Sequence, residues 1–166
     1  MFKNLIVVVT CVLIGNTTLH AQGLLTEKNN FTHQDTLRGS ITPERAWWDL
    51  TYYHLNIKVD PDKKFITGSN TIQYKVIDSQ KDLQIDLQAP LKITKVVQDG
   101  EELEVNHHGN AHFIKLNSVQ NIGSIKTIEV FYEGNPKEAV RAPWDGGFSW
   151  KKDGNGNDFV ATSCQG

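Results

Sequence analysis

The sequence predicts an all-β fold, an antiparallel β-sandwich. Three observations lead to this prediction. Apolar residues recur at every second position in one segment after another, which is the spacing of a strand with one buried face. Groups of turn-forming residues separate these segments about every ten residues, and no helical spacing of apolar residues is visible after residue 21. Such a series of short strands buries its apolar faces by packing one sheet on another.

Length and composition limit the classes of function. The chain has 166 residues, enough for one domain and a leader. Its hydrophobic content of 39% and charged content of 22% are those of a globular protein. The formal net charge of −2 excludes a strong electrostatic attraction to nucleic acid or to an anionic membrane. Two cysteines are too few for a disulfide scaffold.

Residues 1–21 have the order of parts found in a secretory signal peptide. Lys3 supplies the positive charge, an apolar run extends from Leu5 to Ile14, and Ala21 marks the expected cleavage site. The run is about half the ~20 residues that a membrane-spanning helix needs. We therefore expect export to the periplasm or the extracellular space, with no membrane span in the mature form. A buried N-terminal helix and a lipoprotein signal at Cys11 are the alternatives.

Residues 22–43 are polar and lack an apolar period, so we expect an extended arm ahead of a β domain at 44–166. The first strand of that domain is expected at 53–59, with one buried face. Its apolar residues are Tyr53, Leu55, Ile57 and Val59. The second strand is expected at 65–77 and contains Gly68, which indicates a bulge or a close approach of the backbone.

The remaining strands follow the same reasoning. They are expected at 83–87, 91–98, from 103 onward, 113–116, 125–132, 146–150 and 159–163. Asp99-Gly100 predicts a hairpin turn. Residues 153–158 predict a hairpin tip, because Asp, Asn and Gly tolerate a positive φ angle.

Three histidines lie close together in the sequence, at His107, His108 and His112. The last two are four residues apart, as in the helix that binds zinc in many metalloproteases. However, Gly109 stands where that motif needs a glutamate, and the segment lies between strands. We therefore expect a polar loop with exposed imidazoles and no metal site.

The predicted hairpin tip has oxygen-bearing side chains at the spacing of a calcium loop, at Asp153, Asn155, Asn157 and Asp158. A calcium loop needs glycine at its sixth position and glutamate at its twelfth. Asp158 and Cys164 occupy those positions. The segment is therefore interpreted as a plain hairpin tip.

The aromatic residues Trp47, Trp48, Tyr52 and Tyr53 form a cluster that either covers the core or offers a ligand platform, and the core is favoured. The same two interpretations, core or ligand platform, apply to Trp144 and Trp150. Cys164 lacks a neighbouring base that would activate it as a nucleophile. These residues therefore contain no complete catalytic site.

Two stretches, in this order, resemble one known family. The first is Ile41 to Val59 followed by Phe65 to Ile72, which resembles the opening of zinc aminopeptidases related to aminopeptidase N and leukotriene hydrolase. The second is Pro143 to Trp150 followed by Phe159 to Gly166, which resembles the end of the N-terminal domain in the same family. The resemblance covers roughly residues 38–166. It implies a saddle-shaped antiparallel β domain that packs beside a thermolysin-like catalytic domain.

The resemblance also implies that this domain and the catalytic domain have different roles. In the family the zinc ligands and the substrate loop follow this domain, so we expect no catalytic residue, metal ligand or cofactor in this chain, and no peptide hydrolysis by the chain alone. Gln165 matches the family glutamine that reaches into the active-site cleft and holds the free amino end of a peptide. A carboxamide suits this role because it both accepts and donates hydrogen bonds.

Three hypotheses for function follow. The leading one is the N-terminal, non-catalytic domain of a secreted zinc metallo-aminopeptidase, which supports a catalytic domain missing from this chain and lines the peptide-binding cleft. The second is a stand-alone β-sandwich module that binds carbohydrate or protein, and the third is a structural or adhesive β domain. An apolar face left without a partner would favour the first, and two or more tryptophan rings on one flat surface would favour the second.

Overall fold

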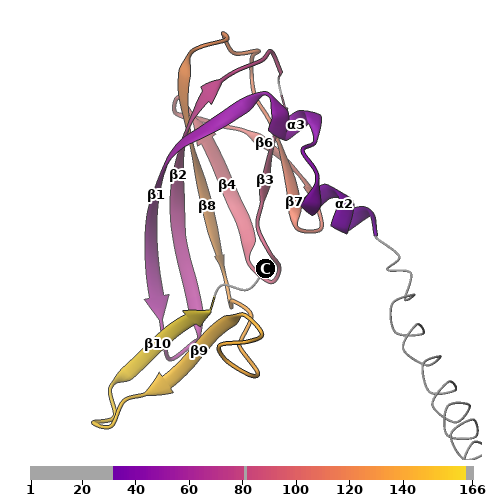
Figure 1. The fold of residues 1–166 in the computed structure, drawn as a ribbon. Coiled ribbons are helices and arrows are strands. Elements are labelled where there is room, and N and C mark those ends of the chain that lie inside the picture. The colour runs from indigo at the N-terminus through magenta and orange to yellow at the C-terminus, as the bar shows by residue number, and fades with distance from the viewer. Residues whose placement is uncertain (1–31, 81, 164–166) are drawn as a thin grey trace, which may run out of the picture. The chain divides into compact units, whose positions relative to one another are not determined.

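The computed structural model describes residues 32–80 and 82–163. Two short helices, α2 (His33–Gly39) and α3 (Pro43–Ala46), precede a series of strands (Figure 1). The strands are β1 (Trp48–Asp60), β2 (Phe65–Val76), β3 (Asp82–Asp86), β4 (Lys92–Gln98), β5 (Glu101–Glu102), β6 (Glu104–His108), β7 (Ala111–Lys115), β8 (Ile125–Gly134), β9 (Gly147–Lys152) and β10 (Asp158–Ser163). The predicted all-β fold is confirmed.

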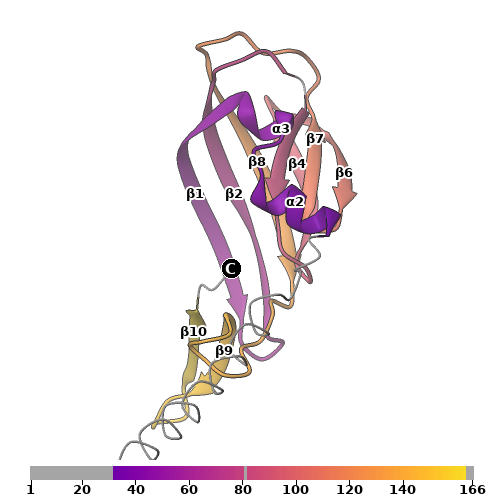
Figure 2. The same cartoon turned by 45° about the vertical axis from the view of Figure 1, so that its right-hand side comes forward.

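The strands form two sheets and a separate hairpin. The large sheet has the order β1-β2-β8-β4-β5, and the small sheet has the order β3-β7-β6. Strands β9 and β10 pair with each other at one end of the large sheet (Figure 1). Every pairing between these strands is antiparallel. Helix α3 contacts β3 and helix α2 contacts β7, so both helices lie against the small sheet (Figure 2).

The core lies between the two sheets. Strands β2, β8 and β4 of the large sheet supply residues such as Ile72, Ile128 and Val96, and the small sheet supplies Leu83 and Ile114. These side chains are at most 1% exposed. The alternation of apolar residues therefore predicts the inward face correctly in β2 and β8.

Strand β1 departs from its prediction. It forms as expected, with Tyr53 opposite Ile72 and Leu55 opposite Asn70. However, the expected buried face of β1 is wrong, because its apolar side chains are 42–58% exposed. β1 is an edge strand, and the core residues of its neighbour β2 are concentrated at Ile72, Tyr74 and Val76, toward the start of β1.

Gly68 shows the close backbone approach that the sequence indicated. A Cβ atom at this position would lie 2.0 Å from the carbonyl oxygen of Asn56 on β1. The sheet irregularity lies elsewhere, in β1 between Leu50 and Tyr52. Glycine is therefore required at 68 by packing between two strands and not by a bulge.

The expected extended arm is wrong over residues 33–39, which form α2. Thr32 and Asp35 form a capping box, in which each side chain bonds the backbone N–H of the other residue. Leu37 is the buried residue of this helix. Seven residues with one buried apolar side chain are too short to show a helical period.

Several predictions about the chain ends fall outside the described residues. These are the signal peptide at 1–21 and the first part of the arm at 22–31. Within the described part of the chain, no helix has the length and apolarity needed to cross a membrane.

Candidate functional site

The end of β10 forms one wall of a cavity of about 390 Å³. Thr162 and Ser163 from β10 face Phe148 from β9 and the segment before β4, which contributes Gln88 and Leu91. Ser163 is the last described residue, so the predicted substrate-binding residue Gln165 and the neighbouring Cys164 lie outside the described residues. The cavity is thus the described surface that lies nearest in sequence to Gln165.

The loop before β9 is held in place by backbone hydrogen bonds and by the Asp145 side chain. Phe148 donates its N–H to the Lys137 carbonyl at 2.8 Å and accepts from the N–H of Ala139 at 2.9 Å. One carboxylate oxygen of Asp145 accepts from the backbone N–H groups of Val140 and Arg141 at 2.5 and 2.8 Å. These hydrogen bonds lower the pKa of Asp145. The β9–β10 hairpin therefore leaves the large sheet from a loop with defined geometry.

Five apolar side chains of β1 form what we name the apolar stripe. Its members are Leu50, Tyr53, Leu55, Ile57 and Val59, which are 43%, 47%, 58%, 47% and 42% exposed. Isolated exposed apolar residues are ordinary on protein surfaces, whereas a contiguous row of them marks an interaction surface. The stripe begins at a groove of about 500 Å³, which is lined by Leu50, Tyr53 and Asn70 among others.

Asn70 is placed beside this stripe, opposite Leu55 on β1 and Val130 on β8. Its side-chain oxygen is buried and has no hydrogen-bond partner among the described residues. A buried acceptor without a donor costs free energy.

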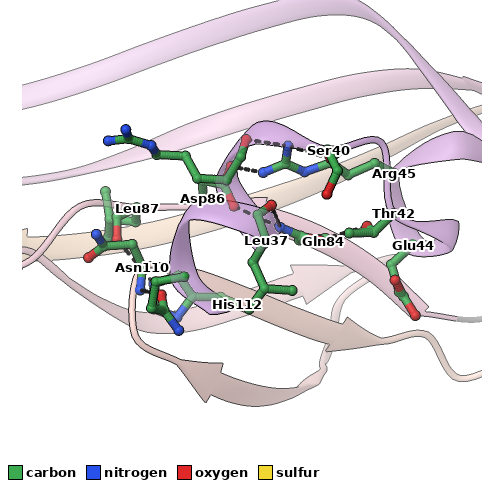
Figure 3. Close-up of polar contacts among 12 residues, drawn as sticks. Leu37, Ser40, Thr42, Glu44, Arg45, Gln84, Asp86, Leu87, Asn110 and His112 are labelled. Carbon is green, nitrogen blue, oxygen red and sulfur yellow. Dashed lines mark hydrogen bonds and ion pairs between the residues drawn. The ribbon is translucent and has the colours of Figure 1, made fainter. Parts of the chain in front are cut away.

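A polar network fixes the two helices to the small sheet (Figure 3). Gln84, which is 2% exposed, donates its amide to the Leu37 carbonyl at 3.2 Å and accepts from the Thr42 hydroxyl at 2.7 Å. Arg45 forms an ion pair with Asp86 and also donates to the carbonyl of Arg38. The segment that precedes β1 is therefore attached to β3 by side-chain contacts.

The histidines lie in the β6–β7 hairpin and not in a loop. His107 and His112 are opposite each other, and their Nδ1 atoms are 2.7 Å apart. His107 and His108 are exposed as expected, but His112 is only 5% exposed, so the prediction of exposed imidazoles is wrong there. Burial lowers the pKa of His112.

These residues do not fit a zinc site. Zinc sites in proteins use at least three protein ligands. Within residues 32–80 and 82–163, no three His, Cys, Asp or Glu side chains come together in a way that could hold a metal ion. The Nδ1 atoms of His107 and His112 bond each other, and Nε2 of His112 lies 3.3 Å from the Leu87 carbonyl.

The turn at 153–158 is the plain hairpin tip that the sequence predicted. One carboxylate oxygen of Asp153 accepts from the N–H groups of Asn155 and Asn157, both at 2.8 Å. Lys152 pairs with Asp158 across the base of the tip at 2.5 Å. The carboxylates of Asp153 and Asp158 therefore hold the hairpin tip together.

The aromatic cluster divides between core and surface. Trp47 is 1% exposed and packs edge-on against Tyr74, with ring centroids 5.8 Å apart. Trp48 packs against the same ring. Tyr52 and Tyr53 are about half exposed, and Trp144 is 77% exposed, so the favoured core interpretation is wrong for these three.

The same architecture is found in solved structures of known proteins. The M1 zinc metallopeptidase from Deinococcus radiodurans matches 64% of this chain and 24% of its own chain, with a TM-score of 0.52 and 15% identity. Yeast LTA4 hydrolase matches 69% of this chain and 18% of its own, with a TM-score of 0.52 and 19% identity. This chain shares its fold with part of the M1 zinc metallopeptidases. The family resemblance predicted from the sequence is therefore confirmed at the level of the fold.

The shared fold covers a limited part of those metallopeptidases. A mutant of the Deinococcus enzyme bound to the substrate Tyr-Ser-Ala matches 64% of this chain and 27% of its own, at a TM-score of 0.52 and 14% identity. The chain thus spans about a quarter of the M1 metallopeptidases to which it is similar. No protein-family model and no curated protein matches the sequence.

Sequence reasoning missed several residues that organise the site. Gln84 stands at a polar position of an alternating strand but is buried by α2 and α3, which the sequence did not predict. Asn70 lies opposite the apolar Leu55 and Val130 on the two neighbouring strands, whereas its chain neighbours Ser69 and Thr71 are polar and give no local signal of its environment.

Proposed function

We propose that this chain is the N-terminal, non-catalytic β domain of an exported zinc metallo-aminopeptidase. Its role is to support the catalytic domain and to form one wall of the peptide-binding cleft. The fold shared with part of the M1 zinc metallopeptidases supports this proposal. In this proposal the chain contributes binding and positioning, and hydrolysis belongs to the catalytic domain.

The apolar stripe of β1 is the observation that carries the proposal. Its five side chains retain roughly half of their exposure, 42–58%. Fully burying such a side chain is worth about 1.5–3 kcal/mol, so covering the stripe would contribute roughly 1 kcal/mol for each residue. A catalytic domain that packs on this face would gain that stabilisation.

The segment after Ser163 supplies the proposed contact with substrate. By the family resemblance, the carboxamide of Gln165 accepts a hydrogen bond from the free amino end of a peptide. The loop that leads into the β9–β10 hairpin is fixed by the Asp145 carboxylate. The proposed ligand of Gln165 is thus the free amino end of a peptide.

The first experiment is to read the coding DNA beyond the codon of Gly166 and to express the whole open reading frame. We expect the frame to encode a His-Glu-x-x-His helix, and its product to release chromogen from aminoacyl substrates in a chelator-sensitive manner. The 166-residue chain alone should show no turnover with or without chelator. A stop codon directly after Gly166, or chelator-sensitive turnover by the short chain, would contradict the proposal.

Gln165→Ala in that full product tests the proposed substrate contact. A hydrogen bond to a charged group contributes about 1.5–3 kcal/mol, so we expect kcat/KM to fall roughly 10- to 100-fold. The effect should require a free peptide N-terminus in the substrate or inhibitor. The matched control is Gln88→Ala, at the rim of the nearby cavity, which should leave kcat/KM within about twofold. Equal effects of the two substitutions would contradict the assignment.

The described tryptophans do not favour the alternative of a sugar-binding module. Trp47 is buried, Trp48 and Trp150 are partly buried, and Trp144 is strongly exposed. A flat platform needs at least two exposed rings on one surface. Among residues 32–80 and 82–163 we find one tryptophan of that kind, so the aminopeptidase proposal is preferred.

A further inference from the structure

The side chains of His107 and His112 can hold one excess proton but not two. The Leu87 carbonyl can only accept, so Nε2 of His112, 3.3 Å away, must donate to it. In neutral His112 the Nδ1 atom is then an acceptor, and His107 Nδ1 donates to it across 2.7 Å. A proton on the exposed Nε2 atom of His107 would leave this contact intact. A proton on His112 Nδ1 would place two N–H groups against each other.

This histidine pair lies directly beside the turn that receives α2. Gly109 turns the chain between β6 and β7 with a φ of +63°, and a Cβ atom there would lie 2.4 Å from the side-chain oxygen of Gln34. The Gln34 amide donates to the His108 carbonyl at 3.1 Å and accepts from the N–H of Asn110 at 3.3 Å. The two hydrogen bonds of the Gln34 side chain therefore depend on the conformation of the turn at residues 108–110.

The same turn is tied to the end of β3. Leu87 donates its N–H to the Asn110 carbonyl at 3.0 Å, and Ala89 donates to the Asn110 side-chain oxygen at 2.9 Å. Figure 3 shows Leu87, Asn110 and His112 gathered at this point. A shift of the His112 ring would therefore disturb both the Leu87 contact and the support of the turn.

We propose that the His107–His112 pair makes the attachment of α2 to the β6–β7 hairpin sensitive to acid. When the second proton enters, the rings separate, the turn loses its conformation, and Gln34 loses both of its partners. The direction follows from linkage: unfolded histidines accept both protons near their ordinary pKa of about 6.5, whereas the paired rings accept one. Attachment is therefore strongest above about pH 6.5 and weakens as the pH falls below that value.

The other charged groups around His112 do not replace His107 as its partner. Opposite His112, β3 presents Ile85, and the next residue, Asp86, is bound by Arg45 and Gln84. On α2, the Asp35 carboxylate accepts from the backbone N–H of the N-cap residue Thr32, and both His33 and Arg38 are exposed. On β6, His108 packs edge-on against Phe113. Near the far end of the hairpin, Glu104 pairs with Lys115.

Hydrogen exchange of the full 166-residue chain tests this proposal between pH 7 and pH 5. Protection factors correct for the intrinsic pH dependence of exchange. If the folded pair excludes one proton completely, protection of the α2 amides and of the Leu87 amide should fall by up to about 25-fold over this range. Amides of the β2–β8 pairing should keep their protection, which shows that the fold persists. Unchanged protection of α2 in the wild-type chain would overturn the proposal.

Two matched variants separate the pair from a general charge effect. His107→Gln replaces an exposed ring with a carboxamide that can accept from a protonated His112, so most of the acid-induced loss should disappear. His108→Gln removes the adjacent exposed histidine and should retain the full loss. An equal loss in wild type and His107→Gln, or a reduced loss in both variants, would overturn the proposal. Ring ¹⁵N shifts at pH 7 should show His112 protonated on Nε2, and the opposite tautomer would also overturn it.

Discussion

The hydroxyl of Tyr74 donates a hydrogen bond to the side-chain oxygen of Gln120, 2.8 Å away in the core. The amide of Gln98 donates to the same hydroxyl at 3.0 Å, and the Gln120 amide donates to the Gln98 oxygen at 2.7 Å. The three side chains form a closed ring, and each is at most 8% exposed. Burial raises the pKa of Tyr74. The ring therefore satisfies polar groups at the place where β2, β4 and the segment before β8 meet.

Tyr74→Phe should destabilise the domain. The substitution keeps the ring that packs on Trp47 but leaves the Gln120 oxygen without its donor. The Gln98 amide keeps only its long contact with the Thr127 carbonyl, at 3.4 Å. An unsatisfied buried polar group costs about 1–3 kcal/mol, and we expect a loss in that range from urea denaturation. Tyr132→Phe is the control, because Tyr132 is also buried and no described residue bonds its hydroxyl. Similar losses in both variants would show that the hydrogen-bonded ring has no special role.

Gly68→Ala should also destabilise the domain, through overpacking. Its Cβ atom would lie 2.0 Å from the Asn56 carbonyl oxygen, and the backbone of β1 would have to move. Overpacking of this kind costs about 1–3 kcal/mol. Gly154→Ala is the matched control, because no atom lies within 4 Å of its added carbon. Thermal denaturation should therefore separate the two variants, and equal melting temperatures would refute the close approach at 68.

The fold was predictable where local pattern and tertiary packing agree. Alternation located β2 and β8, because strand formation and burial both follow from the same period of two. β4 was expected from a less regular pattern, and its buried residues Ile93, Val96 and Gln98 do not follow that period, because the register shifts between Ile93 and Lys95. In β1 the period again predicts a strand, but burial depends on whether another element covers the face. The pattern identifies which side of β1 is apolar, but it does not show whether another element packs on that side. Helix α2 was missed because its stability comes from the Thr32 cap and the docking of Leu37.

The candidate site was less predictable than the fold. The spacing of His108 and His112 suggested a helix motif, whereas in the hairpin His112 lies opposite His107 because the turn falls between them. Gln84 became important through helices that the sequence did not reveal. Gln165 remains a prediction from the family resemblance, because it lies outside the described residues. Contacts across long sequence separations were the information that local reasoning lacked.

Asp86→Asn should loosen the segment before β1 with little effect on global stability. The Asp86 and Arg45 side chains are 39% and 23% exposed, and partly exposed ion pairs contribute about 0–1 kcal/mol. The local effect should be larger, because Arg45 also holds the carbonyls of Arg38 and Ser40. We expect faster hydrogen exchange in residues 36–46, and the difference from wild type should shrink at high salt. Glu138→Gln, in the exposed Lys64–Glu138 pair, is the control and should leave that segment unchanged.

The apolar stripe should make the 166-residue chain self-associate or bind a hydrophobic dye. Leu55 and Ile57 are 58% and 47% exposed, so Leu55→Lys with Ile57→Lys removes apolar surface at a small cost in stability. We expect the double variant to stay monomeric in analytical ultracentrifugation at concentrations where the wild-type chain associates. Asn56→Lys with His54→Lys adds the same charge at alternate positions of β1 and should associate as wild type does, because it leaves the stripe intact. Equal association of all three chains would contradict the role of the stripe as an interaction surface. It would also take away the main support for docking of a catalytic domain.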